Sequence, residues 1–64
     1  MNRYEITYVD QEETEFVECD FFNHPQSSPG FFTFMVKDER EYPMPILVVS
    51  AEIVLRVQQR ENHG

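Results

Sequence analysis

Several residue types are scarce in this chain. Its 64 residues include one cysteine, two glycines, one lysine and no tryptophan. A lone cysteine excludes an internal disulfide and is typical of a reducing compartment, so we expect a cytoplasmic protein. The longest apolar run, residues 46–49, is far shorter than the roughly 20 residues of a membrane-spanning helix. We therefore expect no membrane partner, and the first residues also lack the apolar stretch of a signal peptide.

Acidic residues outnumber basic ones by twelve to five, which gives a formal net charge of −7. Such a charge weighs against binding of nucleic acid through a broadly basic surface. Apolar residues make up 41% of the chain and nine residues are aromatic, which is too many for a disordered segment. We therefore expect one small domain over residues 1–58, followed by a frayed polar tail over residues 59–64.

Apolar and polar residues alternate in two early segments, and a period of two predicts strands. The inward side chains are Tyr4, Ile6 and Tyr8 in the first segment and Val17, Cys19 and Phe21 in the second. An antiparallel hairpin centred on Glu12 and Glu13 places Tyr8 opposite Val17. A slip by one residue would expose every one of these apolar side chains, so burial fixes the alternation.

Residues 31–36 and 42–49 predict a third and a fourth strand after a loop with two prolines and a glycine. A turn around residues 39–40 places four apolar side chains on a common face. These side chains are Phe32, Phe34, Leu47 and Val49. Pro43 and Pro45 lack an N–H donor on the same side of the strand, which predicts that this strand begins at a sheet edge.

The last segment, residues 52–58, alternates again and predicts a strand with Ile53, Leu55 and Val57 inward. Before it, the Ser50 hydroxyl suits the opening of a single tight turn. A helix over residues 50–60 is the alternative, which the β-branched residues of the segment disfavour.

This layout of hairpin, long loop, hairpin, turn and final strand resembles the small SH3-like and Sm-like barrels. Residues 49–57, with the sequence VSAEIVLRV, are similar to the short turn and last strand that close an SH3 barrel. The resemblance implies an all-β fold, a five-stranded antiparallel SH3-like barrel with one short 3-10 turn before the last strand. The opening hairpin is also similar to that of many small bacterial and phage proteins. No tryptophan and no RNA-pocket motif is present, so no ligand-binding residue is transferred from these families.

Residues that carry chemistry are sparse. Cys19 lies on the inward side, where cysteine behaves as a small hydrophobe, so we expect a core residue rather than a metal ligand. His24 and His63 lie too far apart to complete a zinc site. The acidic turns lack the spacing and the glycine of a calcium loop. Because no nucleophile triad or phosphate loop is present, we expect no enzyme activity, no cofactor and no metal.

The chain has more large apolar residues than the inward positions accommodate. We expect this surplus to form a protein-interaction surface, either for a homo-oligomer or for docking of an accessory protein on a larger partner. Its residues are Phe16, Phe22, Phe31, Met35, Met44 and Ile46, and Val48 has the same outward parity. The alternative is that the alternation of the later strands is misassigned and that some of these residues are core.

Two further functions are compatible with the sequence. Glu5, Glu18 and Asp20 fall on the polar side of the first hairpin, where a negative face suits a nucleic-acid mimic that blocks a basic site on a host protein. The second alternative is an Sm-like or OB-like single-strand binder, in which exposed aromatic rings stack on bases and Arg56 and Arg60 form a small basic patch.

Overall fold

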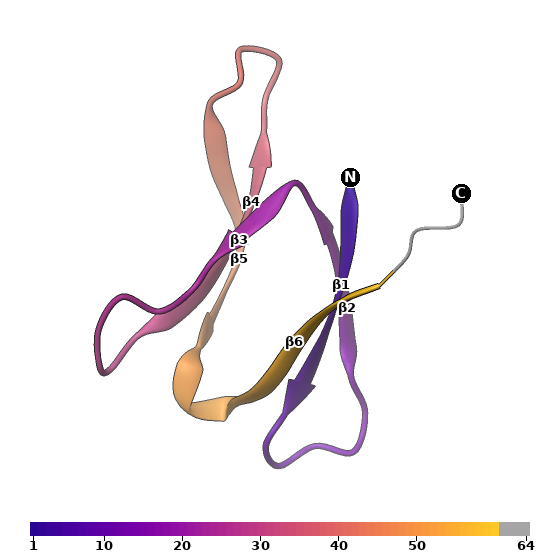
Figure 1. The fold of residues 1–64 in the computed structure, drawn as a ribbon, viewed down its shortest axis with the longest axis vertical. Coiled ribbons are helices and arrows are strands. Elements are labelled where there is room, and N and C mark those ends of the chain that lie inside the picture. The colour runs from indigo at the N-terminus through magenta and orange to yellow at the C-terminus, as the bar shows by residue number, and fades with distance from the viewer. Residues whose placement is uncertain (61–64) are drawn as a thin grey trace.

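The computed structural model describes residues 1–60, which form six strands and one 3-10 turn. The elements are β1 (Asn2–Tyr8), β2 (Glu15–Cys19), β3 (Phe21–Asn23), β4 (Phe31–Lys37), β5 (Pro43–Ser50), η1 (Ala51–Ile53) and β6 (Val54–Arg60). All strand pairs are antiparallel, in a first sheet ordered β2–β1–β6 and a second sheet ordered β3–β4–β5. Figure 1 shows the two sheets side by side, with the three strands of each sheet overlying one another. No helix within residues 1–60 is long and apolar enough to cross a membrane.

The all-β prediction is confirmed, but the expectation of a closed barrel with five strands is wrong. The predicted second strand divides at Asp20 into β2 and β3, which belong to different sheets. Within the described residues, β5 pairs only with β4 and β6 pairs only with β1, so the two sheets do not close on each other. The fold is therefore a pair of three-stranded sheets with open edges.

Asp20 joins the two sheets through three separate hydrogen bonds. Its backbone N–H donates to the carbonyl of Met35 over 2.9 Å, and its own carbonyl accepts from Asn2 Nδ2 over 2.9 Å. Its Oδ2 accepts from the backbone N–H of Lys37 over 2.6 Å. The residue at which the chain changes sheets is thus tied to β1 in one sheet and to β4 in the other.

The alternation predicted for the first hairpin is confirmed as far as Cys19 but not at Phe21, and its register is wrong. Val17 pairs with Tyr4 rather than with Tyr8, which is a shift of four residues along β1. An even shift keeps the same side chains inward. The pairing of β1 with β2 ends at Ile6 and Glu15, so the connection between the two strands is longer than the predicted turn.

The common face predicted for the second hairpin is confirmed. Phe32 pairs with Val49 and Phe34 pairs with Leu47. Beyond Phe34 the pairing skips Ile46, because an irregularity lies between Phe34 and Met35. The strand that carries the two prolines, β5, lies at the edge of its sheet, as their missing donors predict.

The turn and the last strand are also present, and the helical alternative is wrong. Ser50 Oγ accepts a hydrogen bond from the backbone N–H of Glu52 over 3.3 Å at the start of η1. However, Ile53 and Leu55 are 45% and 69% exposed, so only Val57 of the three predicted inward residues packs against the core. The cause is an irregularity between Thr7 and Tyr8 that leaves Leu55 without a paired residue and turns Val54 inward.

Strand β6 also runs further than predicted. Gln59 and Arg60 pair with Tyr4 and Arg3, although the sequence placed them in the polar tail. The rest of that predicted tail, residues 61–64 with His63, lies outside the described residues.

The core is small and lies between the sheets. Its buried side chains are Tyr4, Ile6, Tyr8, Cys19 and Phe34. Partly buried apolar side chains pack around them, namely Val17, Phe22, Phe32, Val36, Leu47, Val49, Val54 and Val57. The Phe22 ring contacts the rings of Tyr4 and Phe34, with centroid distances of 5.0 and 5.4 Å.

Cys19 is a core residue, as predicted. It is fully buried, and its Sγ donates a weak hydrogen bond to the carbonyl of Phe21 over 3.4 Å. Burial raises the pKa of the Cys19 thiol. A buried thiol held in its neutral form is a poor nucleophile and a poor metal ligand.

Candidate functional site

The outer face of the second sheet carries most of the exposed apolar side chains of β4 and its neighbours. Phe32 and Phe34 of β4 contact the core, so the alternate residues Phe31, Thr33 and Met35 lie on the opposite side of the sheet. Residues paired across an antiparallel sheet share a face, which extends this surface onto both neighbouring strands. We call the following residues the apolar face: Phe21, Phe31, Met35, Pro45 and Val48.

Much of the apolar face is accessible to solvent. Phe31 and Val48 are each 54% exposed, while Phe21 and Met35 are half-buried. Ile46 is the β5 residue that is skipped in the pairing with β4. It lies between Pro45 and Leu47 and is 48% exposed. Phe21, Met35 and Pro45 make one row across the three strands, and Thr33 lies between this row and Phe31 along β4.

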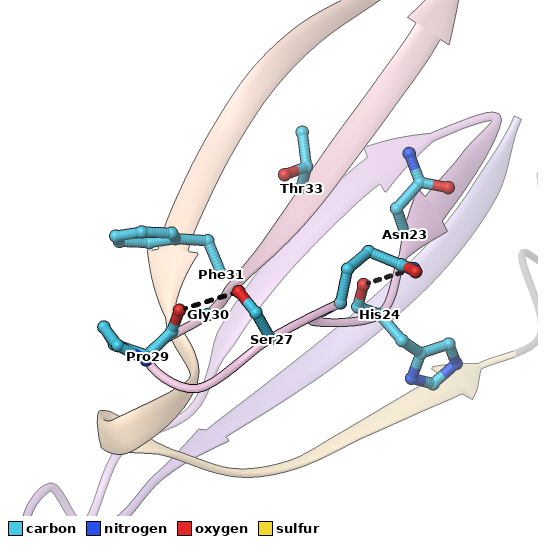
Figure 2. Close-up of a pocket in the computed structure, with 8 residues that line it drawn as sticks. Asn23, His24, Ser27, Pro29, Gly30, Phe31 and Thr33 are labelled. Carbon is cyan, nitrogen blue, oxygen red and sulfur yellow. Dashed lines mark hydrogen bonds between the residues drawn. The ribbon is translucent and has the colours of Figure 1, made fainter.

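A shallow pocket of about 620 Å³ lies on the same side of the second sheet, beside Phe31. Figure 2 shows Phe31 and Asn23 on opposite sides of it, with Thr33 between them and the loop of residues 24–30 below. The pocket is lined by Asn23, His24, Gln26, Ser27, Pro29, Gly30, Phe31 and Thr33. None of these side chains is an acid, a lysine or an arginine, so the lining provides polar contacts without a fixed charge.

The loop beside the pocket is held by its own hydrogen bonds. Gln26 Nε2 donates to the carbonyl of His24 over 3.2 Å, and Ser27 Oγ donates to the carbonyl of Pro29 over 3.1 Å. Gly30 is buried, and a Cβ at this position would lie 2.7 Å from Pro25 Cβ. Only glycine therefore lets the loop fold back this closely. The His24 ring points away from Asn23 in Figure 2 and packs on Phe22, with a centroid distance of 4.9 Å.

The structure distributes the predicted interaction residues over several places. Phe31 and Met35 lie on the apolar face, and Ile46 lies next to it on β5. Met44 is 52% exposed but pairs with Val36, whose side chain packs against the core. The other two residues are separate, since Phe22 is partly buried against the core and Phe16 lies on the first sheet.

The alternation in the sequence predicts Phe21 inward, but Phe21 lies on the apolar face. The alternation along β2 restarts after Asp20, so Phe22 rather than Phe21 faces the core. The sequence signal at this place is the pair Phe21 and Phe22. Two consecutive strand residues point to opposite sides, so one of the two rings has to face outward. Asn23 and Thr33 carried no such signal, because their shared pocket depends on the pairing of β3 with β4.

The outer face of the first sheet is charged. Tyr4, Ile6 and Tyr8 point to the core, so Arg3, Glu5 and Thr7 point outward. Their paired neighbours complete this face. Glu18 and Arg60 flank Arg3, Phe16 and Gln58 flank Glu5, and Arg56 pairs with Thr7.

Glu5 is neutralised within this face. Its Oε1 lies 2.7 Å from Arg60 Nη2 and 2.8 Å from Arg60 Nε, and its Oε2 accepts from Thr14 Oγ1 over 2.9 Å. The hydrogen bond from Arg60 lowers the pKa of Glu5, and the bond from Thr14 acts in the same direction. Of the two other acids predicted beside it, Glu18 pairs with Arg3 in the sheet register and Asp20 lies at the junction of the sheets.

The acidic turn between β4 and β5 uses one carboxylate to shape its backbone. Asp38 Oδ1 accepts from the backbone N–H groups of Arg40 and Tyr42, over 2.8 and 3.0 Å. Within residues 1–60, no three histidine, cysteine or acidic side chains are placed together as metal ligands.

In comparisons with known proteins, no protein-family model, curated protein or solved structure matches the chain.

Proposed function

We propose that this chain is a non-enzymatic protein-interaction module that binds its partner through the apolar face. The observation that carries the proposal is the row of apolar side chains across β3, β4 and β5, together with Phe31 and Val48 on the same face, each 54% exposed. Covering apolar surface contributes about 25 cal/mol per Å², and aromatic residues and methionine are enriched at interface cores. The uncharged pocket beside Phe31 adds hydrogen-bonding groups to the edge of this surface.

The distribution of charge favours a partner with a basic rim. Acidic residues crowd the turn of residues 38–41, which adjoins one end of the apolar face, and the loop that joins β1 to β2. A negative rim speeds the encounter with a positive one and excludes other negative surfaces. An accessory protein that docks on a larger, basic surface fits this arrangement better than a self-associating chain with a net charge of −7.

We further propose that the fold is an open variant of the SH3-like arrangement. Its support is a strand that changes sheets at Asp20 and a 3-10 turn that returns the last strand to β1. The alternative function, a nucleic-acid mimic, has weaker support because Arg60 neutralises Glu5 and Arg3 lies beside Glu18 in the sheet.

The test compares three variants with the native chain. Phe31→Asp and Val48→Asp each place a charge on the apolar face, and Leu55→Asp is the matched control because Leu55 is a 69% exposed strand residue on β6. We expect the two face variants to lose the partner captured by the immobilised native chain, and the control to retain it. Light scattering measures whether that partner is a second copy. Capture that is unchanged in both face variants would contradict the proposal.

A further inference from the structure

Three of the four arginines of the chain lie on the outer face of the first sheet. Arg3 and Arg60 are paired neighbours, and Arg56 lies opposite Thr7 on the same two strands. Together with Glu5 and Glu18, these residues give the face a formal charge of +1, although the whole chain carries −7. Basic side chains are therefore concentrated here while the acids gather in the turns. We call Arg3, Phe16, Arg56 and Arg60 the arginine face.

Two of these arginines form no salt bridge with a described acid, although the charge of Arg56 contributes to the lowered pKa of Glu5. Arg60 is held by Glu5, but Arg3 and Arg56 form no ion pair with any described residue. Glu18 is the paired neighbour of Arg3, yet their charged groups do not meet within salt-bridge distance. The guanidinium groups of Arg3 and Arg56 are thus available to a ligand.

Arg3 is stacked on an aromatic ring. Its Cζ lies 4.2 Å from the centroid of the Phe16 ring, and Phe16 is 48% exposed. A guanidinium over a ring is preorganised, and both its second plane and its N–H edge remain available for contacts. A base stacks on such a plane, and a phosphate binds its edge.

We propose that the arginine face binds single-stranded nucleic acid. A base stacks on the Arg3–Phe16 pair, and phosphates of the same strand bind at Arg3 and Arg56. Arg3 and Thr7, the partner of Arg56, are four residues apart on β1, which corresponds to about 13 Å, so the two guanidinium groups meet different nucleotides. An acidic peptide fits less well, because a carboxylate needs only the edge of a guanidinium and leaves the stacked plane unused.

The expected binding is weak and depends only modestly on salt. Two phosphate contacts give a slope of about −1.4 for the logarithm of affinity against the logarithm of salt concentration, or about a sevenfold loss for a fourfold rise in salt. The negative charge of the rest of the chain opposes binding, and salt screens this repulsion beyond about 10 Å at 0.1 M. The measured slope is therefore no steeper than about −1.4.

The experiment measures the fluorescence anisotropy of a labelled oligothymidylate titrated with the full chain at low salt. We expect binding that Arg3→Gln and Arg56→Gln each weaken and that Phe16→Leu weakens about tenfold through loss of stacking. Arg40→Gln is the matched control, because it removes the same charge from the turn between β4 and β5. Circular dichroism confirms that each variant retains its strands.

Several outcomes would overturn this proposal. They are an anisotropy that stays flat, an equal loss in Arg40→Gln, and equal binding of an abasic oligonucleotide, which would exclude base stacking. Displacement of the oligonucleotide by polyglutamate at the same charge concentration would assign the face to acidic protein segments instead. Val48→Asp changes the apolar face only, so we expect it to keep its oligonucleotide binding. Failure of the nucleic-acid proposal is therefore distinguishable from failure of the proposed protein interaction.

Discussion

The partly buried hydrogen bond of Tyr8 makes the stability of this chain sensitive to alkaline pH. Tyr8 is only 9% exposed, and its hydroxyl donates to Glu15 Oε1 over 2.5 Å. Burial, reinforced by the Glu15 carboxylate, raises the pKa of Tyr8 from 10.0 to about 12. Below the unfolded pKa, both folded and unfolded chains hold the proton and the stability is complete. Between the two pKa values, only the unfolded chain ionises, so stability falls as the pH rises.

The size of this loss follows from the pKa difference. A difference of about 2 corresponds to about 3 kcal/mol. A single core in a chain of this size rarely supplies more than about 3–5 kcal/mol of stability. The ionisation of one phenol therefore removes most of the stability, and we expect the chain to unfold as the pH approaches the folded pKa of Tyr8.

The assay is urea unfolding followed by circular dichroism from about pH 9 to about pH 12. Tyr8→Phe is the matched variant, because it keeps the ring in the core and removes the group that ionises. At neutral pH the variant loses about 1 kcal/mol with its hydrogen bond. Its unfolding free energy then stays flatter than that of the native chain as the pH rises. Parallel decline of the two chains would refute the role of Tyr8.

Two further predictions test the loop and the core. Gly30→Ala places a Cβ against Pro25 and the Ser27 carbonyl, and we expect a loss of about 1–3 kcal/mol in thermal unfolding. An unchanged melting temperature would contradict the close approach at Gly30. Because Cys19 is fully buried and its pKa is raised, we expect a thiol reagent to modify the folded chain far more slowly than the urea-unfolded chain. Equal rates would place Cys19 outside the core.

The parts of the fold that the sequence predicts are those fixed by local alternation. Tyr4, Ile6 and Tyr8 alternate with polar residues, and their burial leaves one choice of inward side. Ile46 and Val48 flank Leu47 with side chains that are as apolar as the inward one, so the pattern there carries less information. Irregularities at Tyr8 and in β5 then displace the register, because one skipped residue reverses every later side chain.

The candidate surfaces were predictable to different degrees. Exposure of Phe31 and Ile46 follows from a surplus of apolar residues over inward positions. The arginine face follows only in part: the sequence predicts a patch of Arg56 and Arg60, but the addition of Arg3 depends on its pairing with Arg60 at the other end of the described chain. No local pattern reports such a pairing, since it is set by how the last strand returns to the first.

The three hydrogen bonds of Asp20 have a mechanical consequence. They connect the first sheet to the second at one residue, through its N–H, its carbonyl and its carboxylate. The apolar face and the arginine face belong to different sheets, so the junction at Asp20 and the shared core together hold the two faces in one relative orientation. A protein bound to the apolar face and a nucleic-acid strand bound to the arginine face would then keep a fixed orientation relative to each other.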